Sequence, residues 1–578
     1  MITSILNTLR IFKKQNIFLI LFYSLILIIT EVISISLLFP LMLIVFNKEN
    51  IILTKFEYFL VDQNLIFINF FISFILFLLS IYFLRFILST LLGFKIADFK
   101  ASIQKFYSKL ALKYFLYGPY INFKNHNSNE FSVLVSKETE KFANAVDALV
   151  KIFTEGLIIF LILSVLLYQN FLISILLITV LIVLFLFTKF FFNPFVKRWG
   201  ERYTHHDINR MTSLNEIFNL IKEIKIFGKT KDFIRKYSFD NARTQIAQRN
   251  RLFFSLFIRN FIELSLVAFI IFTIVFVNFK GVKLENFFPT ISFFFLALLR
   301  TLPSGIKILN SIQLILFSKK SIDFTSNLAK FHNNLAKLGE GNYLIDKNQK
   351  EPRNTFKKKK NSLILKKISF SYKNDKVINN LSIKFDDNNI IGIKGQSGSG
   401  KTTLVEIILG LIKPNSGKIL LNKRNIKDLG AKWKNKISYV SQDNNLFSGS
   451  AYQNIAFEPD IRSLDKEDIK NLIKKLNLRF YKKFKNKLNK KIHFNSRNLS
   501  GGEKQRLSIA RGLFRHKDII ILDEITSSLD NENEIEILKE LKKFKKNKII
   551  IIVSHKKSSL KVCDKIYELK DLKLKKIK

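Results

Sequence analysis

The sequence predicts an α-helical membrane region with six spans, followed by a soluble α/β domain. The chain has 578 residues, of which 48% are apolar and 24% charged, so it is too long for one compact domain and too apolar for a disordered chain. Its mean hydropathy is +0.15 despite that charge, so apolar and charged residues must be segregated. Long apolar stretches lie before residue 330, and short β-rich runs alternate with helical ones after residue 361.

Each of the apolar stretches is long enough to cross a bilayer, which takes about 20 residues. The first lacks a small-residue cleavage site and is longer than the apolar core of a signal peptide, so we expect it to be retained. The six predicted spans are residues 16–46, 65–94, 150–168, 171–195, 253–279 and 286–317.

The distribution of basic residues predicts the orientation of these spans. The chain carries 93 Lys and Arg against 45 Asp and Glu, a net charge of +48. Short cytoplasmic loops collect Lys and Arg, and here these residues concentrate in 95–141 and 197–236. In the opposite loops, the only basic residues are Lys48, Lys55, Lys280 and Lys283. We therefore expect both termini and the second domain to be cytoplasmic.

Both long inner loops have helical periodicity, so the spans are predicted to continue into the cytosol. Turns near 118–127 and 219–228 would then be available to dock on another domain; the alternative is that they are ordinary solvated loops. On the outer side, residues 47–64 mix apolar and polar side chains, which suits a short helix lying on the membrane surface.

The predicted domains are a transmembrane domain over residues 1–330, a linker over 331–361 and an α/β domain over 362–578. Lys357–Lys360 end the linker and indicate a solvated spacer, with anionic lipid headgroups as an alternative contact. The one cysteine, Cys563, excludes a disulfide within one chain and a Cys-rich metal site. It agrees with a reducing, cytosolic location for this domain.

A glycine-rich loop follows the strand predicted over 390–394 and precedes an apolar helix that begins at Lys401. This strand-to-helix context is the one that a phosphate-binding loop requires, because backbone N–H groups and the helix N-terminus then surround the phosphates. Lys401 would pair with the β and γ phosphates of ATP, and the Thr402 hydroxyl would ligate Mg²⁺. The predicted set is Gly395, Gln396, Ser397, Gly398, Ser399, Gly400, Lys401, Thr402 and Thr403.

Two acids end a second buried strand. Residues 519–522 are all apolar, as expected for a central parallel strand, and Asp523 and Glu524 follow directly. Asp523 would hold the magnesium shell, and Glu524 would polarise an attacking water. The alternative is a pair of acids at an exposed strand end.

The string Leu499-Ser500-Gly501-Gly502-Glu503 opens another helix and resembles the signature motif of ATP-binding-cassette (ABC) ATPases. Glu503 stands where Gln is commoner in that family. Ser500 and the amides of Gly501 and Gly502 at a helix start form a second anion site. In the family, this site closes on the γ-phosphate bound by the other subunit.

The resemblance assigns roles to residues that would mean little alone. Tyr372 matches the aromatic that stacks on adenine, Gln442 the glutamine that senses magnesium and γ-phosphate, and His555 the switch histidine. It implies Glu524, His555 and Lys401 as catalytic residues and Thr402, Gln442 and Asp523 as magnesium ligands. Ser528, Leu529 and Asp530 match the loop after the catalytic glutamate, with Asp530 at the nucleotide.

Two departures from the family pattern leave the fine coupling open. Residues 554–557 lack the arginine usual after the switch histidine, and residues 495–498 lack the usual glycine-containing stretch. Six spans followed by one cassette resemble an exporter-type half-transporter with the ABC exporter fold. One cassette supplies half of each composite ATP site, so the resemblance implies a homodimer that binds ATP and Mg²⁺.

Charged residues inside the spans are costly and usually functional. Arg85 and Arg259 are predicted near the cytoplasmic face and Arg300 deeper, and Glu31 lies in the first span. Such a basic ladder would suit a phosphate or pyrophosphate headgroup, because the guanidinium fork matches phosphate oxygens. In the alternative, Arg85 and Arg259 snorkel, Arg259 pairs with Glu263, and Arg300 is structural.

Residues 294–308 around Arg300, with Arg85 and Arg259, resemble bacterial flippases for lipid-linked oligosaccharides (PglK type). In that family, arginines facing the cavity bind the pyrophosphate of a polyprenyl-linked glycan, and an external surface helix follows the first span. The resemblance thus implies Arg85, Arg259 and Arg300 as substrate residues. It implies an ATP-driven flippase in the bacterial inner membrane, with membrane lipid and an anionic lipid-linked oligosaccharide as partners.

Two other functions are weighed against this one. The same machinery would serve an exporter of another lipid, a peptide or a drug-like amphiphile, which ATPase stimulation by those compounds would reveal. A basic ATPase that acts on nucleic acid would need only one membrane anchor, so six spans predict no nucleic-acid partner.

Overall fold

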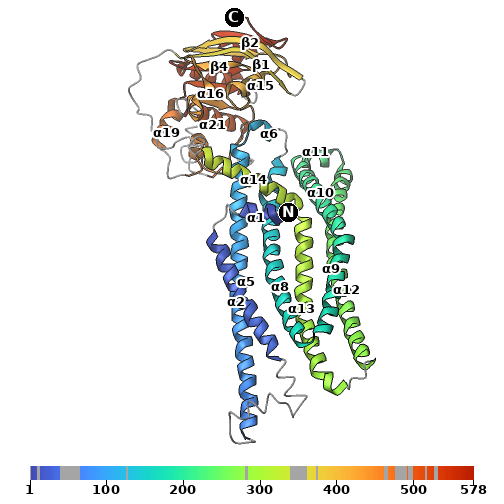
Figure 1. Cartoon of the computed structure of the whole chain (residues 1–578). Helices are drawn as coiled ribbons and strands as arrows, with labels where there is room; N and C mark the ends of the chain where they lie inside the picture. Colours follow the sequence, from blue (N-terminus) through green and yellow to red (C-terminus); the bar gives the residue numbers. More distant parts are fainter. Residues whose placement is uncertain are drawn as a thin grey trace. The chain divides into compact units, whose positions relative to one another are not determined.

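The computed structural model describes residues 2–9, 14–38, 65–124, 128–279, 284–338, 361–372, 375–460, 466–475, 491–492, 499–514, 517–525 and 531–577. The expected surface helix at 47–64, the stretch 495–498 and Ser528, Leu529 and Asp530 therefore lie outside the described residues. The chain forms two compact units. One comprises Met1–Gly118 and Phe123–Asn334, and the other comprises Pro119–Asn122 and Leu335–Lys578 (Figure 1).

Within the described residues, the first unit contains six helices that are long and apolar enough to cross a membrane, which confirms the predicted number of spans. Each contains an apolar stretch of at least 18 residues, so that part of the helix is suited to a lipid environment. The helices are α2 (Lys14–Ser36), α5 (Leu65–Tyr117), α8 (Thr139–Gln169), α9 (Phe171–Phe191), α12 (Thr230–Phe279) and α13 (Leu284–Phe317).

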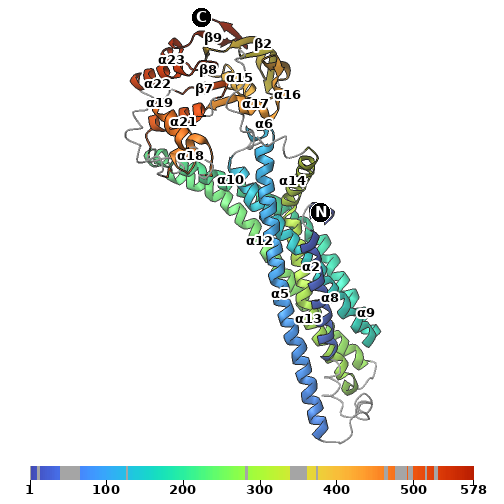
Figure 2. The same cartoon turned by 90° about the vertical axis from the view of Figure 1, so that its left-hand side faces the viewer.

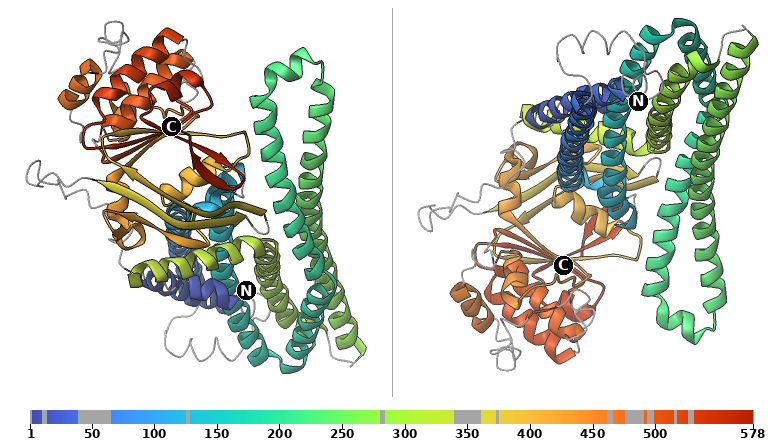
Figure 3. Two further views of the ribbon diagram at one scale, coloured as in Figure 1. Left: turned by 90° about the horizontal axis from the view of Figure 1, so that it is seen from above. Right: turned by 90° about the horizontal axis from the view of Figure 1, so that it is seen from below.

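Two of these helices are far longer than a bilayer requires. α5 has 53 residues and α12 has 50, and at about 1.5 Å per residue both exceed the roughly 30 Å hydrocarbon core more than twofold. Their lengths agree with the predicted extension beyond the membrane, which stays a prediction. α10 (Asn193–Asn219) runs antiparallel to α12, and the short α11 (Ile221–Ile226) joins them (Figure 3).

The turns expected at the ends of these extensions contain short helices. α6 (Tyr120–Lys124) follows α5, and α11 lies within 219–228. Ile226 and Phe227 at the second turn are exposed, with 79% and 73% of their surface accessible. Docking of either turn on another domain stays a prediction.

Further helices complete the described part of this unit, among them the one labelled α14 in Figure 2. They are α1 (Ile2–Leu9), α7 (Ser128–Val133), the π-helix η1 (Leu134–Glu138) and α14 (Lys319–Leu338). α14 continues eight residues into the predicted linker, and residues 339–360 lie outside the described residues. The domain boundaries near residues 330 and 361 therefore stay a prediction.

α10 and α13 approach each other closely at Gly200. A Cβ atom at this position would overlap the backbone oxygen of Phe317. The Arg251 guanidinium of α12 lies over the Phe317 ring, 5.3 Å from its centroid. A glycine is thus required where the backbone of one helix contacts the next.

The second unit is built on two sheets, which confirms the predicted α/β architecture. The antiparallel sheet has the order β2-β1-β4-β5, and the larger sheet has the order β10-β9-β3-β8-β7-β6, in which the strands from β9 to β6 are parallel. The strands are β1 (Ser362–Tyr372), β2 (Asp375–Asp386), β3 (Asn389–Lys394), β4 (Ser416–Leu421), β5 (Arg424–Asn425), β6 (Ile437–Val440), β7 (Ile519–Asp523), β8 (Ile549–Val553), β9 (Lys565–Lys570) and β10 (Lys573–Lys576).

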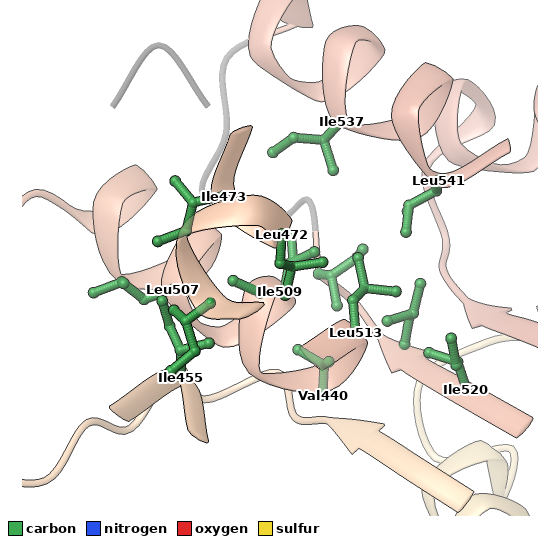
Figure 4. Close-up of a cluster of buried hydrophobic side chains, with 14 of the residues drawn as sticks. Val440, Ile455, Leu472, Ile473, Leu507, Ile509, Leu513, Ile520, Ile537 and Leu541 are labelled. Carbon is green, nitrogen blue, oxygen red and sulfur yellow. The ribbon is translucent and has the colours of Figure 1, made fainter. Parts of the chain in front are cut away.

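Helices cover the larger sheet and enclose its apolar side chains. Ile520 on β7 packs in one cluster with Leu513 of α21 (Gly501–Phe514) and Leu541 of α22 (Asn531–Lys543) (Figure 4). Cys563 is buried in the same cluster. The other helices are α15 (Lys401–Ile408), α16 (Ile426–Leu429), α17 (Ala431–Lys436), α18 (Ala451–Ala456), α19 (Lys466–Lys475) and α23 (Lys557–Lys561).

The parallel register brings the carboxyl ends of four strands to one sheet edge. Gly392 on β3 and Leu522 on β7 both pair with Ile552 of β8, and Val440 of β6 pairs with Leu522. The residues that follow these strands therefore emerge side by side, as ligand-binding residues do in open α/β sheets.

Candidate functional site

The loop between β3 and α15 has the backbone geometry that its glycines allow. Gly398 and Gly400 have φ angles of +80° and +95°, which side chains rarely tolerate. A Cβ at Gly400 would also lie 2.7 Å from the side chain of Val377. Glycine at these positions is therefore required by the loop itself, which turns back over the start of α15.

Lys401 is folded onto the loop. Its ammonium group donates to the backbone oxygens of Gly395 and Gln396, both at 2.8 Å. Thr402 and Thr403 follow in the first turn of α15, where Thr403 is buried. This places the predicted phosphate-binding residues around the amino end of one helix.

Glu524 lies between the ends of two other strands. Its carboxylate accepts a hydrogen bond from the Gln442 amide at 2.7 Å and contacts the His555 ring nitrogen Nδ1 at 3.2 Å. The backbone of Glu524 has a φ of +48°, and its N–H donates to Val553 at 2.9 Å. The structure thus brings together Gln442, Glu524 and His555, which the sequence separates by up to 113 positions.

Asp523 is more enclosed than Glu524. Burial raises the pKa of its carboxyl group, while a hydrogen bond from the Tyr439 hydroxyl at 3.2 Å acts in the opposite direction. Burial, together with this same carboxylate, raises the pKa of Tyr439. Sequence reasoning missed Tyr439. Its position three residues before Gln442, on the strand next to β7, was the signal that could have found it.

Tyr372 lies at the end of β1 in the antiparallel sheet. Its hydroxyl donates to the Glu406 carboxylate at 3.3 Å, and its ring makes an edge contact with Phe370 at 4.8 Å. Glu406 belongs to α15, so the tyrosine predicted to stack on adenine is connected to the helix that follows the glycine-rich loop.

Ser500, Gly501 and Gly502 lie at the start of α21. The Ser500 N–H donates to the Glu503 carboxylate at 2.7 Å, and the Glu503 N–H donates to the Ser500 hydroxyl at 3.2 Å. This reciprocal pair is a capping box, which explains why Glu is compatible with the position where Gln is commoner. The helix amino end keeps the positive potential of a predicted anion site.

The donors at the sheet edge fit Mg²⁺ and a nucleotide. Thr402, Asp523 and the side-chain oxygen of Gln442 are oxygen ligands, which Mg²⁺ prefers, and the Gln442 nitrogen is already used by Glu524. The glycine backbone of the loop leaves room for phosphate oxygens close to its N–H groups. The roles of these residues stay predictions.

A second group of charges lies inside the spans. The Glu31 side chain of α2 is almost fully buried, and its Oε1 atom accepts hydrogen bonds from both Arg85 of α5, at 2.9 Å, and Arg300 of α13. Two cations thus share one carboxylate oxygen. Both guanidinium groups reach the same atom, and the expected order of depth, with Arg300 deeper than Arg85, stays a prediction. α5 extends well beyond the length of a span, so residue counts along it do not measure depth.

Arg300 extends this cluster towards α8. It donates to the Ser304 hydroxyl at 3.0 Å, and Ser304 donates to Glu155 at 2.6 Å, where Lys307 also binds at 2.6 Å. Sequence reasoning missed Glu155, Ser304 and Lys307. For Ser304 and Lys307, the signal was the spacing of 300, 304 and 307, which puts three polar side chains on one face of α13.

Arg259 has a different partner. Its Nε atom donates to Glu263 one helical turn away at 2.9 Å, and 57% of its side chain is exposed. The structure therefore brings Arg85 and Arg300 together and pairs Arg259 locally. A substrate role for each of the three stays a prediction.

Comparison with known families identifies the class. A profile described as ABC transporter matches residues 378–527, and one described as ABC transporter transmembrane region matches residues 17–302. The chain belongs to the ABC transporter family, with a transmembrane region followed by an ATP-binding domain. The predicted family and fold class are confirmed, and the family is one of ATP-hydrolysing transporters.

Three curated relatives show the range of functions in the family. An export ATP-binding/permease protein of Rickettsia bellii is 39% identical over 36% of this chain and 36% of its own length. An ATP-dependent lipid A-core flippase of Francisella tularensis is 34% identical over 36% and 34%. A lacticin-481/lactococcin-DR transport/processing protein of Lactococcus lactis is 30% identical over 64% and 51%. The chain thus matches between a third and a half of each relative.

A solved structure matches nearly the whole chain. It is a bacterial Atm1-family ABC exporter with ATP bound, with a TM-score of 0.68 and 17% sequence identity, covering 97% of this chain and 95% of the other. At this identity the match shows the fold, which is that of an ABC exporter.

Proposed function

We propose that this chain is an ATP-driven flippase that moves an anionic, polyprenyl-diphosphate-linked oligosaccharide from the cytoplasmic to the outer leaflet of the bacterial inner membrane. The observation that carries the proposal is the convergence of Arg85 and Arg300 on Glu31 inside the spans. The two arginines and the one carboxylate together carry one net positive charge. An excess charge on half-buried side chains inside the spans is costly, and an anionic ligand group would neutralise it.

The geometry of the cluster favours a phosphate-containing headgroup. Each guanidinium carries five N–H donors in a planar fork, and Glu31 and Ser304 use only some of them. A diphosphate presents several oxygens that two such forks bind together. The lipid tail would stay in the bilayer, and the relative named as a lipid A-core flippase supports a lipid substrate.

ATP would supply the energy at the sheet edge of the second unit. The loop of 395–400 and Lys401 would hold the phosphates, and Glu524 would accept a proton from the attacking water. Bound Mg²⁺ would supply charge neutralisation at the phosphate oxygens. Ser500 and the Gly501 and Gly502 amides would complete the site of a second copy, so the functional form would be a homodimer with cytoplasmic ATPase domains.

The proposal is tested with full-length protein reconstituted in vesicles, by measuring ATP-dependent translocation of the lipid-linked oligosaccharide. Arg85→Ala leaves Glu31 paired with Arg300 alone, so the cluster becomes neutral while one buried ion pair remains. We expect Arg85→Ala and Arg300→Ala to reduce translocation by about tenfold or more, and Arg259→Ala to report whether the exposed arginine contributes. Arg198→Ala, on the exposed face of α10, is the control. Unchanged translocation in both Arg85→Ala and Arg300→Ala would refute the headgroup role.

A second substrate class is supported by one comparison. The relative named for lacticin and lactococcin transport matches 64% of this chain, more than the flippase relative does. A peptide exporter predicts ATPase stimulation by cationic or apolar peptides and indifference to the glycolipid. It gives the Arg85–Glu31–Arg300 cluster no ligand, which is why we favour the anionic lipid.

A further inference from the structure

Two neighbouring cavities in the first unit lie between α9, α12 and α13. One has a volume of about 160 Å³ and is lined almost entirely by apolar side chains, including Leu181, Ile262 and Leu302. The other has a volume of about 130 Å³, and its lining includes Lys189, Asn193 and Gln313. Phe185 and Leu309 line both cavities, so the apolar one and the polar one are adjacent.

The three helices place the polar cavity at the same end. On α9 the lining proceeds from Leu181 to Lys189, eight residues or about 12 Å along the axis. On α13 it proceeds from Leu302 to Gln313, and on the antiparallel α12 it proceeds from Leu266 back to Ile258. The proposed topology puts this polar end at the cytoplasmic side. A polar end and an apolar end in this order match an amphiphile of the inner leaflet.

Gln313 gives an independent sign that the polar cavity has an occupant. It is 4% exposed, it lines the cavity, and its Nε2 amide nitrogen has no hydrogen-bond partner among the described residues. A buried amide donor without a partner costs about 1–3 kcal/mol. An acceptor oxygen from a ligand headgroup would remove that cost. Lys189, which is exposed at the same cavity, supplies a positive charge for an anionic headgroup.

Gly305 keeps the apolar cavity open. It lies on α13 among the lining residues, and a Cβ added there would meet nothing within 4 Å. The first atom of a larger side chain would therefore meet no described protein atom, and the side chain would occupy part of the cavity that Gly305 lines. An added Cβ at Gly156 of α8 would also have open space around it, and Gly156 lines neither cavity.

We propose that these two cavities form a binding site for an anionic phospholipid of the inner leaflet. Its phosphodiester headgroup is bound by Lys189 and the Gln313 amide, and one acyl chain occupies the apolar cavity beside Gly305. The site is separate from the Arg85–Glu31–Arg300 cluster, and it holds a resident lipid, whether or not the proposed substrate is correct. Bound lipid then stabilises the packing of α9, α12 and α13.

The test uses the purified full-length chain in detergent, without nucleotide, titrated with phosphatidylglycerol and followed by its melting temperature. Phosphatidylcholine is the neutral comparison, and glycerol phosphate supplies the headgroup chemistry without acyl chains. We expect stabilisation by phosphatidylglycerol alone. Lys189→Gln should raise the half-saturating lipid concentration about fivefold, and Gly305→Leu should abolish the effect. Lys197→Gln and Gly156→Leu are the matched controls and should behave as the wild type.

Three results would overturn the proposal. Equal stabilisation by the two phospholipids would show that no anionic headgroup is recognised. An unchanged response in both Lys189→Gln and Gly305→Leu would place the lipid elsewhere. If these variants change the dimer fraction in sedimentation while the lipid response is retained, the cavities are covered by a second copy of the chain.

Discussion

The Gln442 amide donates a hydrogen bond to the Glu524 carboxylate at 2.7 Å, across the ends of neighbouring strands in one sheet. The same carboxylate contacts His555, so both groups proposed to sense the nucleotide are bound to the proposed base. A carboxylate held in this way is positioned before any water arrives. Both oxygens of the carboxylate already have partners. Gln442 or His555 would therefore have to move when Glu524 accepts a proton from water.

Glu524→Gln should abolish ATP turnover while ATP binding is retained. The amide keeps the shape and the hydrogen bond to Gln442 but lacks the basic oxygen, so hydrolysis should fall by about 10²–10⁴-fold. Phosphate release and nucleotide binding by the reconstituted chain measure the two effects. Asp571→Asn, in the exposed turn between β9 and β10, is the control. Persistent turnover in Glu524→Gln would reject the assignment of the base.

Glu31→Gln should strengthen binding of the anionic headgroup. The carboxylate competes with phosphate oxygens for Arg85 and Arg300, so its removal should lower the half-saturating glycolipid concentration for ATPase stimulation by about tenfold. The melting temperature should fall, because two half-buried guanidinium groups lose their counter-charge. Glu263→Gln, which affects only the exposed pair with Arg259, should change neither property. An unchanged half-saturation in Glu31→Gln would show that Glu31 does not compete with the ligand.

Gly200→Ala should destabilise the first unit. The added methyl group would overlap the Phe317 backbone, which cannot move without shifting α13, at a cost of about 1–3 kcal/mol. A lower melting temperature of the detergent-solubilised chain would report this. Gly93→Ala is the matched control, since its Cβ meets nothing within 4 Å and alanine favours the helix. Equal melting temperatures for the two variants would contradict the close approach.

Lys548 predicts a pH dependence of stability. Burial lowers the pKa of its ammonium group to about 8, below the usual 10.5, and the group donates to the Lys517 backbone oxygen at 3.0 Å. A lysine with a depressed folded-state pKa binds fewer protons when folded. Its contribution to stability is therefore greatest above pH 10.5 and is lost as the pH falls towards 8.

Lys548→Met removes this titration. At neutral pH the variant should be more stable by about 1–2 kcal/mol, because the buried charge is gone and one hydrogen bond is lost. The difference in melting temperature from the wild type should shrink between pH 8 and 10.5. Lys546→Met, at an exposed position nearby, should show no such trend. A difference that stays constant with pH would show that Lys548 titrates normally.

The ATP-binding unit could be predicted in detail because each of its motifs is formed by residues that are adjacent in the sequence. The strand at 390–394, the glycine-rich loop and the helix from Lys401 are contiguous, and each element indicates the next. The apolar run of 519–522 is fully buried, as its composition predicts. Tyr439 was missed because its contact with Asp523 spans 84 residues and depends on the strand order, which one sequence does not reveal.

The arrangement of charges in the spans could not be predicted in the same way. Helical periodicity gives the face of each helix, but the packing of α2, α5 and α13 decides which faces meet. Glu31 lies 54 residues from Arg85 and 269 from Arg300, yet both arginines donate to the same oxygen atom of Glu31. The local pair of Arg259 and Glu263, in contrast, follows from a separation of four residues and was predicted as an alternative.

The burial of Cys563 has a practical consequence for experiments on this protein. The thiol is 2% exposed within the core of the ATP-binding unit, and the sequence has no other cysteine. Thiol-reactive spectroscopic labels should therefore not react with the native chain. Engineered pairs of cysteines on α5 and α12 would carry such labels without removal of the native thiol, so distances between the helices could be followed through a transport cycle in otherwise unmodified protein.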